Sequence, residues 1–138
     1  MLPFLVNMDR LFELFVAEWL SAHPLPGLSV ASQDHAIIGS EGSLRFDIDL
    51  VLYDQETEQA RCVLDTKYKE DRSSADVAQV VAYATAKDCE EAVLVYPSPL
   101  SVPLNVPVGR IQVRGVTFSL AGDLEQAGQD FVDALVGT

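Results

Sequence analysis

Acidic and basic side chains suited to cleaving a phosphate ester occur on two neighbouring segments of the chain. The pattern Phe46-Asp47-Ile48-Asp49 is followed, beyond a polar turn, by Leu64-Asp65-Thr66-Lys67. Two carboxylates can hold a divalent cation, and an ammonium group can stabilise negative charge that develops on a phosphate. Both segments alternate apolar and polar residues, which is typical of half-buried strands. The spacing therefore predicts a hairpin with this chemistry on one face.

The register of that hairpin decides whether the charged side chains meet. A three-residue loop at 56–58 places Asp47 opposite Lys67 and Asp49 opposite Asp65, with all four side chains pointing the same way. A one-residue slip or a single β-bulge separates them. We expect the register in which they converge.

Asp47 and Asp65 are the candidate metal ligands, with the backbone carbonyl of Thr66 as the third. Mg²⁺ prefers such oxygen ligands, and Mn²⁺ is an alternative ion. Two carboxylates about 4 Å apart repel by roughly 4 kcal/mol at an effective dielectric of 20, so a cation between them is stabilising. Lys67 is expected to orient the attacking water. The reverse assignment, with Asp49 as ligand and Asp47 on the surface, is equally compatible with the pattern, and both short motifs also occur on ordinary solvent-exposed strands.

Two predicted helices carry further polar candidates. Glu13 lies at the edge of an apolar helical stripe, where a carboxylate is costly unless it is paired or near a metal, so it is either a third ligand or a partly exposed helix residue. Gln79 and Tyr83 are four residues apart on one face of a later helix. A glutamine can donate to a phosphate or a water, and a tyrosine hydroxyl can contact a nucleic-acid backbone. An ordinary amphipathic helix is the alternative.

The elements that must position these residues follow from periodicity and from turn signals. Helices are expected at about 7–22, 73–87 and 124–136, the second opened by a capping box formed by Ser73 and Asp76. Strands are expected at about 44–53, 61–68 and 92–96, with a further strand or pair of strands at 111–120 and two short strands or one broken strand at 28–31 and 36–38. The segments 39–43 and 97–109 are predicted to be a turn and a proline-rich surface loop. This order predicts a mixed α/β sheet with helices on both faces.

Length and composition favour a single domain over residues 1–138. Hydrophobic residues make up 49% of the chain and charged residues 22%, as in ordinary globular proteins. No apolar run approaches the roughly 20 residues of a membrane span. Acidic residues within the first helix argue against a secretory signal, and two cysteines without metal-ligand spacing fit a reduced cytoplasmic protein.

The net charge of −12, from 9 basic and 21 acidic residues, is unfavourable for binding a phosphate backbone. A chain of this charge that cuts DNA is therefore expected to bind it weakly on its own and to rely on another protein to hold it.

These segments together resemble the PD-(D/E)xK nuclease superfamily. More narrowly, they resemble the endonuclease subunit McrC of the McrBC-type, modified-cytosine-dependent restriction systems. The resembling segments are 3–16, 44–48, 63–69, 76–84 and 93–97. The resemblance implies that Asp47, Asp65 and Lys67 fill the three motif positions, although Phe46 stands where the family usually has proline. It also matches Gln79 and Tyr83 to a Q-x-x-x-Y helix found in several branches of the superfamily.

The resemblance further implies a restriction-endonuclease-like αβββαβ core, extended here by a C-terminal strand and helix. The implied activity is Mg²⁺-dependent DNA cleavage without a covalent intermediate, with Tyr83 and Lys69 contacting the substrate. The implied partner is a McrB-like AAA+ GTPase, which docks on an N-terminal region expected to be absent from this chain. Cutting both strands implies a homodimer or a larger assembly. The alternatives are a non-catalytic assembly module with the same fold and a recombination- or repair-type nuclease.

Overall fold

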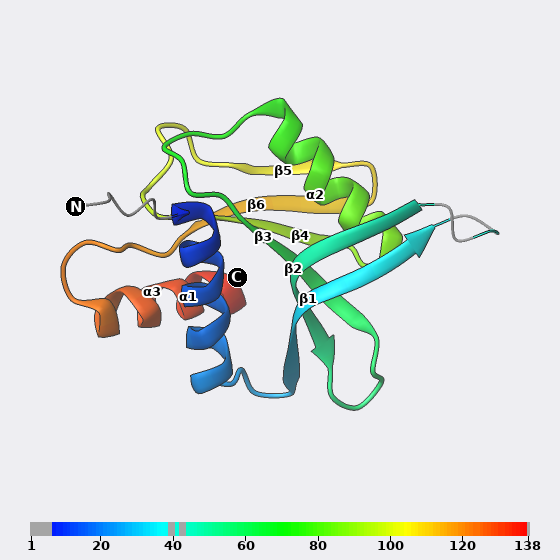
Figure 1. The fold of residues 1–138 in the computed structure, drawn as a ribbon, viewed down its shortest axis with the longest axis horizontal. Coiled ribbons are helices and arrows are strands. Elements are labelled where there is room, and N and C mark those ends of the chain that lie inside the picture. The colour runs from blue at the N-terminus through cyan, green and yellow to red at the C-terminus, as the bar shows by residue number, and fades with distance from the viewer. Residues whose placement is uncertain (1–6, 39–40, 42–43, 138) are drawn as a thin grey trace, which may run out of the picture.

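A six-stranded mixed sheet forms the centre of the computed structural model, which describes residues 7–38, 41 and 44–137 (Figure 1). The helices are α1 (Met8–Ala22), α2 (Ser74–Ala86) and α3 (Leu124–Val136). The strands are β1 (Leu28–Ile38), β2 (Leu44–Asp54), β3 (Ala60–Thr66), β4 (Glu91–Tyr96), β5 (Asn105–Val108) and β6 (Ile111–Thr117), in the sheet order β1-β2-β3-β4-β6-β5. The segment at 3–5 and most of the predicted turn at 39–43 lie outside the described residues.

Antiparallel and parallel pairing divide the sheet. β1, β2 and β3 form an antiparallel meander, β4 lies parallel to both β3 and β6, and β5 returns antiparallel along β6. The helix α2 makes the crossover between β3 and β4, which a parallel pair requires. The predicted α/β class, with a restriction-endonuclease-like core, is confirmed.

Two hydrophobic clusters hold the helices on opposite faces of the sheet. One cluster joins α1 and α3 to Leu50, Leu52 and other sheet residues, and we call it the α1 cluster. The other joins α2 to Ile48, Val51 and their neighbours, and we call it the α2 cluster. Each fully buried aliphatic or aromatic side chain stabilises the fold by about 1.5–3 kcal/mol.

The predicted helix at 7–22 is confirmed in position and in its buried stripe. The side chain of Asn7 caps α1 by accepting from the backbone N–H of Arg10 at 3.1 Å. Phe12, Val16 and Leu20, spaced four residues apart, are buried because side chains at this spacing lie on one helix face. No helix in the described ranges has the length and apolar character needed to cross a lipid bilayer.

The packing of α3 against α1 depends on one glycine. A Cβ atom at Gly128 would lie 1.8 Å from the ring of Trp19, so only glycine allows the two helices to approach this closely. Phe118, which follows β6, packs edge-on against Phe15 of α1 at 5.0 Å and lies 4.9 Å from the ring of Phe131 of α3. The C-terminal part of the chain therefore completes the core beneath α1.

The capping box predicted for the second helix is also confirmed. The hydroxyl of Ser73 accepts from the backbone N–H of Asp76, and the carboxylate of Asp76 accepts from the backbone N–H of Ser73, both at 3.2 Å. These bonds satisfy backbone donors that a helix N-terminus otherwise leaves unpaired. The N-terminal turn of α2 is thereby fixed.

The hairpin register follows the prediction near the charged residues. Leu50 pairs with Leu64 and Val51 with Val63, which extrapolates to Asp49 opposite Asp65. A bulge does occur, but it lies between Leu52 and Tyr53, towards the turn. The pairing register next to Asp49 and Asp65 is therefore preserved.

Two predictions about the ends of the sheet need correction. The segment predicted as an irregular loop at 97–109 contains β5, whose residues are all exposed. β5 is an edge strand, where Pro107 is tolerated because only one side of an edge strand needs backbone donors. The strand predicted at 111–120 ends earlier, at Thr117.

Candidate functional site

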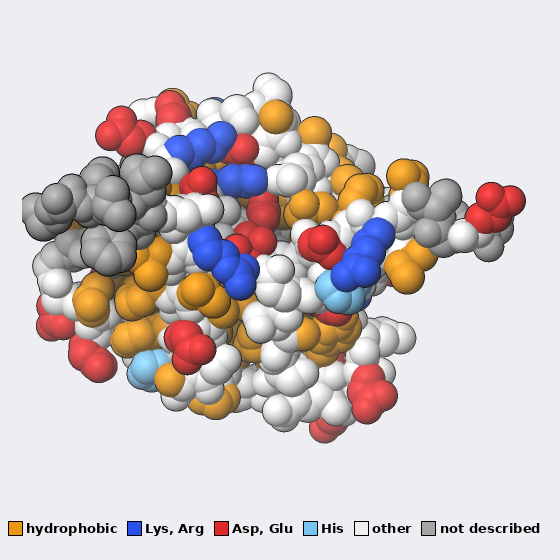
Figure 2. All heavy atoms as spheres, viewed as in Figure 1, with side chains coloured by type: hydrophobic (Ala, Val, Ile, Leu, Met, Phe, Trp, Pro, Cys, Tyr) orange, Lys and Arg blue, Asp and Glu red, His pale blue; other side chains and the backbone are white. Residues whose placement is uncertain are grey.

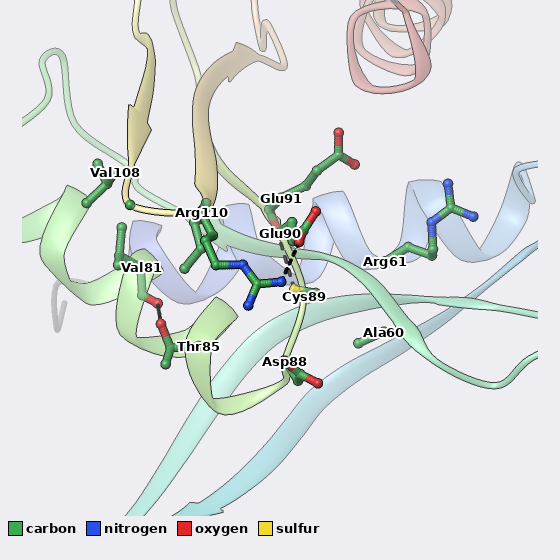
Figure 3. Close-up of a pocket in the computed structure, with 12 residues that line it drawn as sticks. Ala60, Arg61, Val81, Thr85, Asp88, Cys89, Glu90, Glu91, Val108 and Arg110 are labelled. Atoms are coloured by element: carbon green, nitrogen blue, oxygen red, sulfur yellow. Dashed lines mark hydrogen bonds and ion pairs between the residues drawn. The ribbon is translucent and has the colours of Figure 1, made fainter.

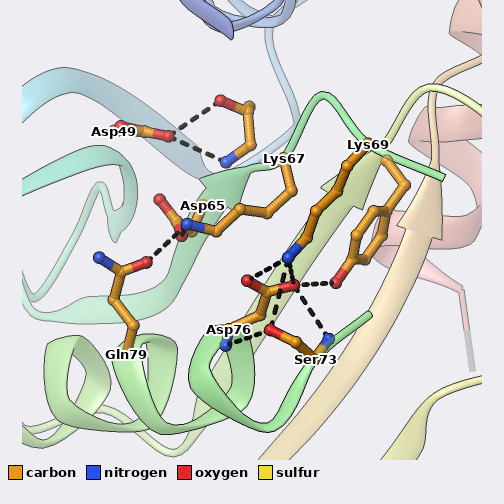
Figure 4. A network of polar contacts seen from close by, with 9 residues as sticks. Asp49, Asp65, Lys67, Lys69, Ser73, Asp76 and Gln79 are labelled. Carbon is orange, nitrogen blue, oxygen red and sulfur yellow. Dashed lines mark hydrogen bonds and ion pairs between the residues drawn. The ribbon is translucent and has the colours of Figure 1, made fainter. Parts of the chain in front are cut away.

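Polar side chains from α1, β2, β3 and α2 line a hollow of about 400 Å³ at the end of β3, between α1 and α2. Its lining consists of Asp9, Glu13, Asp49, Asp65, Thr66, Lys67, Tyr68, Lys69, Asp76, Gln79 and Tyr83. In Figure 2, acidic and basic side chains lie next to one another in the middle of the face shown. Figure 4 shows the polar contacts that link β2, the end of β3 and α2.

Asp49 is held in the hollow by the end of β3. Its Oδ2 accepts from both the backbone N–H and the hydroxyl of Thr66, each at 2.9 Å. Two donors to one oxygen fix the carboxylate against β3. This places the acidic group of β2 beside that of Asp65.

Asp65 is a buried acid with an unusual pKa. Its side chain is 6% exposed, and burial followed by the charge of Asp49 raises its pKa to about 7, against the opposing effect of Lys67. The ammonium of Lys67 lies 2.9 Å from Oδ2 of Asp65, yet no donor among the described residues makes a well-directed hydrogen bond to that oxygen. A buried carboxylate beside a second carboxylate is an environment that favours positive charge, and the Lys67 ammonium supplies part of it.

Lys67 is fixed by two contacts. Besides Asp65, its Nζ donates to Oε1 of Gln79 on α2 at 2.6 Å. Burial acts to lower the pKa of Lys67, but its close contact with the charged Asp65, with the charges of Asp76 and Asp49, outweighs burial and raises the pKa. The lysine is therefore a fixed positive charge at neutral pH.

Glu13 reaches the hollow from α1. Its side chain is 15% exposed and lies 3.5 Å from Arg10. Burial and then the charge of Asp49 raise the pKa of Glu13, with Arg10 acting in the opposite direction. Three carboxylates, from α1, β2 and β3, therefore line one hollow with Asp49 electrostatically coupled to the other two.

Tyr83 lies in the wall of the hollow. It is buried, its ring lies 5.6 Å from that of Phe46, and burial followed by the charges of Asp65 and Asp49 raises the pKa of its hydroxyl. The spacing of Gln79 and Tyr83 thus brings both to the site, as the sequence predicts.

Lys69 lies at the rim, where it pairs with a buried carboxylate of α2. Its Nζ is 2.7 Å from Oδ2 of Asp76, and the side chain of Lys69 is 40% exposed. Asp76 also accepts from the hydroxyl of Tyr96 at 3.1 Å. The sequence identified Asp76 only as a helix cap, because nothing in its spacing reveals that the cap faces the charged end of β3.

Asp47 does not join this group, so its predicted convergence with Asp65 and Lys67 is wrong. Its side chain is 64% exposed and contacts Nδ1 of His35 at 3.0 Å and Nε of Arg45 at 3.1 Å. The strict alternation on which the prediction depended is broken next to Asp49. The reverse assignment, with Asp49 in the site and Asp47 on the surface, describes the structure.

The oxygen ligands in the hollow are of the type that a hard divalent cation prefers, although the carboxylates are not close enough together to form a complete metal site. Within the described ranges, no three His, Cys, Asp or Glu side chains form a group that could hold a metal ion. Mg²⁺ keeps several waters and commonly uses one or two protein carboxylates. Asp49 and Asp65 are the candidate protein ligands that this chemistry allows, and they and the carbonyl of Thr66 stay predictions.

A larger hollow, of about 770 Å³, lies beside the start of β4 and the β5–β6 turn (Figure 3). Its cations are paired, Arg110 with Glu90 at 3.0 Å and Arg61 with Asp54 at 3.1 Å. Burial raises the pKa of the Cys89 thiol there, which disfavours the nucleophilic thiolate. This hollow therefore has exposed ion pairs and an unreactive thiol, whereas the hollow at the end of β3 has adjacent carboxylates with a lysine.

The order of helix, three strands, helix and strand, with an acidic residue within β2, another near the end of β3 and a lysine just after it, defines the restriction-endonuclease-like class of α/β proteins. The family described as McrBC 5-methylcytosine restriction system component matches residues 1–97, and the chain belongs to this family. It is thus a component of a restriction system. The match runs from α1 through β4, the elements that build the hollow. No curated protein matches the chain.

Proposed function

We propose that this chain is a metal-dependent DNA endonuclease of an McrBC-type restriction system, and that the hollow at the end of β3 is its active site. The observation that carries the proposal is the meeting of Asp49, Asp65 and Lys67, two acids and a fixed ammonium, in one partly enclosed place. Family membership supports the restriction role. Metal-assisted phosphodiester hydrolysis uses this combination of acidic ligands and positive charge.

Asp49 and Asp65 are the proposed ligands of Mg²⁺, or of Mn²⁺ in its place, with Thr66 supplying its carbonyl. When bound, the ion supplies positive charge to the scissile phosphate and lowers the pKa of water. Burial disfavours the ionised form of Asp65, and a cation close to the carboxylate favours it, so the ionised acid and the ion stabilise each other.

Lys67 is proposed to stabilise charge on the phosphate and to orient the attacking water. Its raised pKa keeps it protonated, and Gln79 holds it over Asp65. Glu13 is placed to bind a further water or the ion from the α1 side. Lys69 at the rim and the hydroxyl of Tyr83 are the proposed contacts to the DNA backbone.

The net charge of −12 implies that DNA is delivered by a partner. A McrB-like AAA+ GTPase is the proposed partner, consistent with the restriction-system family. Cleavage of both strands then requires two copies of the hollow in one assembly. We propose that this assembly acts in the cytoplasm.

Nicking of supercoiled plasmid at low salt tests the proposal, with and without the partner and with Mg²⁺ or EDTA. Asp65→Asn and Lys67→Ala are each expected to reduce nicking by about 100-fold or more, because each removes charge needed in the transition state. Arg110→Ala is the matched control, since it removes a cation from an exposed pair at the other hollow. Undiminished nicking by Asp65→Asn would refute the assignment.

A non-catalytic assembly module is the competing function, and the acidic composition favours it. Calorimetric titration with Mn²⁺ separates the two possibilities. An active site is expected to bind Mn²⁺ and to lose that binding in Asp65→Asn. A module without catalytic function is expected to show no uptake that depends on Asp65.

A further inference from the structure

Gln33 has a backbone conformation that is unusual inside a β-strand. Its φ of 52° lies in the left-handed region, although Gln33 is in the middle of β1. Two other non-glycine residues, Glu58 and Asp88, share this conformation, but they lie in a hairpin turn and just after a helix. A left-handed backbone is common in turns and at helix C-termini, whereas in the middle of a strand it is a source of conformational strain.

The pairing of β1 with β2 continues on both sides of this residue. Ser32 pairs with Leu50 and Asp34 with Ile48, so Gln33 lies across from Asp49. The kink therefore changes no register. It coincides instead with the position of the proposed metal ligand.

Both strands change face at this pair. On β2, Phe46 and Ile48 pack in the α2 cluster, whereas Leu50 and Leu52 pack in the α1 cluster. These four residues are spaced by two and would share one face of a regular strand.

The same change occurs on β1. Leu28 and Val30 pack against the α1 cluster, whereas Ala36 belongs to the α2 cluster, although all three are spaced by even numbers. The two strands therefore turn over together at Gln33 and Asp49. Figure 1 shows the pair β1 and β2 continuing beyond this region as an arm that projects from the body.

We propose that Gln33 is a positioning residue, whose left-handed backbone turns Asp49 into the hollow and leaves Asp47 outside it. This inference rests on the proposed role of Asp49 as a metal ligand. In a strand of regular alternation Asp47 and Asp49 would point the same way, and the structure shows that they do not.

A polar triad secures the chain next to the kink. The carboxylate of Asp34 accepts a hydrogen bond from the hydroxyl of Tyr53 on β2 and lies 3.1 Å from Nζ of Lys87 at the end of α2. Lys87 also donates to the hydroxyl of Tyr53 at 3.0 Å. The strained residue is thus followed directly by one that is bound to both β2 and α2, which is how a structure maintains local strain.

The test compares substitutions at position 33 in the full chain. Gln33→Gly and Gln33→Asn tolerate φ above zero, whereas Gln33→Ala and, more strongly, Gln33→Val oppose it. The first readout is amide exchange of Thr66, whose N–H donates to Asp49 and reports where that carboxylate lies. The second readout is the rate of Mg²⁺-dependent nicking.

Thr66 protection and nicking are expected to persist in Gln33→Gly and Gln33→Asn. Both are expected to fall by about tenfold in Gln33→Val and by a smaller factor in Gln33→Ala. The alanine variant provides the test if the valine variant does not fold. Glu58→Ala is the matched control, because it places alanine at a left-handed residue away from the hollow. It is expected to leave Thr66 protected.

Equal protection of Thr66 in the glycine and alanine variants would overturn the inference, as would its loss in both. The exchange readout does not depend on catalysis. If the parent chain proves unable to cut DNA while Thr66 still responds to residue 33 as expected, the proposed function fails and the positioning role stands.

Discussion

Asp47 and Asp49 lie two residues apart on β2 and have opposite surroundings. Asp47 is largely exposed and pairs with Arg45 and His35 on the projecting arm. Asp49 lies in the hollow, where it accepts two hydrogen bonds from Thr66 and raises the pKa of Asp65. An exposed carboxylate that contacts Arg45 and an imidazole nitrogen is satisfied as it is. A carboxylate held against another acid gains a great deal from a cation.

This difference shows that a residue's identity in a short motif does not determine whether it lies in the site. The face of the strand on which its side chain lies matters more. The two acids match the same sequence pattern. Their electrostatic environments differ because the strands turn over between them. The comparison can be broken or sharpened by experiments on each acid and on the pairs around it.

Asp49→Asn is expected to have the largest effect, a loss of nicking of about 100-fold or more, because it removes a proposed ligand without changing side-chain size. Asp47→Asn is the matched substitution, and its rate is expected to equal that of the parent protein. Plasmid nicking under single-turnover conditions measures both. The opposite ranking would restore Asp47 as the ligand and contradict the structure.

Asp65→Asn is expected to change how stability depends on pH in metal-free buffer. The folded-state pKa of about 7 lies above the ordinary value of 3.8, so the folded protein binds the proton more tightly than the unfolded chain. Stability should therefore fall as pH rises from about 4 to about 8, by roughly 2 to 4 kcal/mol, and asparagine should remove this loss. Urea unfolding across that range measures it. A parallel pH dependence in both proteins would show that Asp65 is not the titrating group.

Asp76→Ala tests a buried carboxylate at the rim of the hollow. It removes the acceptor for the backbone N–H of Ser73, the pairing with Lys69 and the hydrogen bond from Tyr96, so a loss of about 2 kcal/mol in the free energy of unfolding is expected. Chemical denaturation gives the value. A change within experimental error would mean that water replaces all three contacts.

Arg45→Ala is expected to have the smallest effect. Its partner Asp47 is exposed, and exposed ion pairs contribute little to stability because water and salt screen them. The midpoint of unfolding should stay unchanged. A clear loss of stability would show that the arm depends on this pair and that the contrast with the hollow is weaker than the structure indicates.

Much of the framework could be predicted because local patterns determine it. The Asn7 cap and the spacing of Phe12, Val16 and Leu20 defined α1, and the Ser73 box defined the start of α2. The register of the β2–β3 hairpin near Asp49 also matched the prediction, although the turn differs from the predicted three-residue loop and a bulge between Leu52 and Tyr53 offsets the difference. The common location of Gln79 and Tyr83 in the site could be predicted because residues four apart lie on one face of a regular helix.

The location of Asp47 could not be predicted, because the turn-over of the strands originates in tertiary structure. A glutamine carries no local signal for a left-handed backbone, unlike glycine or asparagine. The broken apolar pattern around 28–38 was the one available sign, and it did not specify where the face changes. The strand β5 was missed because its proline is acceptable only on a sheet edge, and edge position is a property of topology.

The glycine contact between α3 and α1 has a practical consequence for anyone who wishes to produce a shorter form of the chain that keeps the hollow. Cutting the chain at residue 97, where the family match stops, would strip β6 from β4 and remove Phe118 and Phe131 from beneath Phe15. The remainder would carry a bare parallel strand and an uncovered aromatic face, both of which promote aggregation. Expression boundaries should therefore follow the packing of Gly128 on Trp19 rather than the limits of sequence similarity.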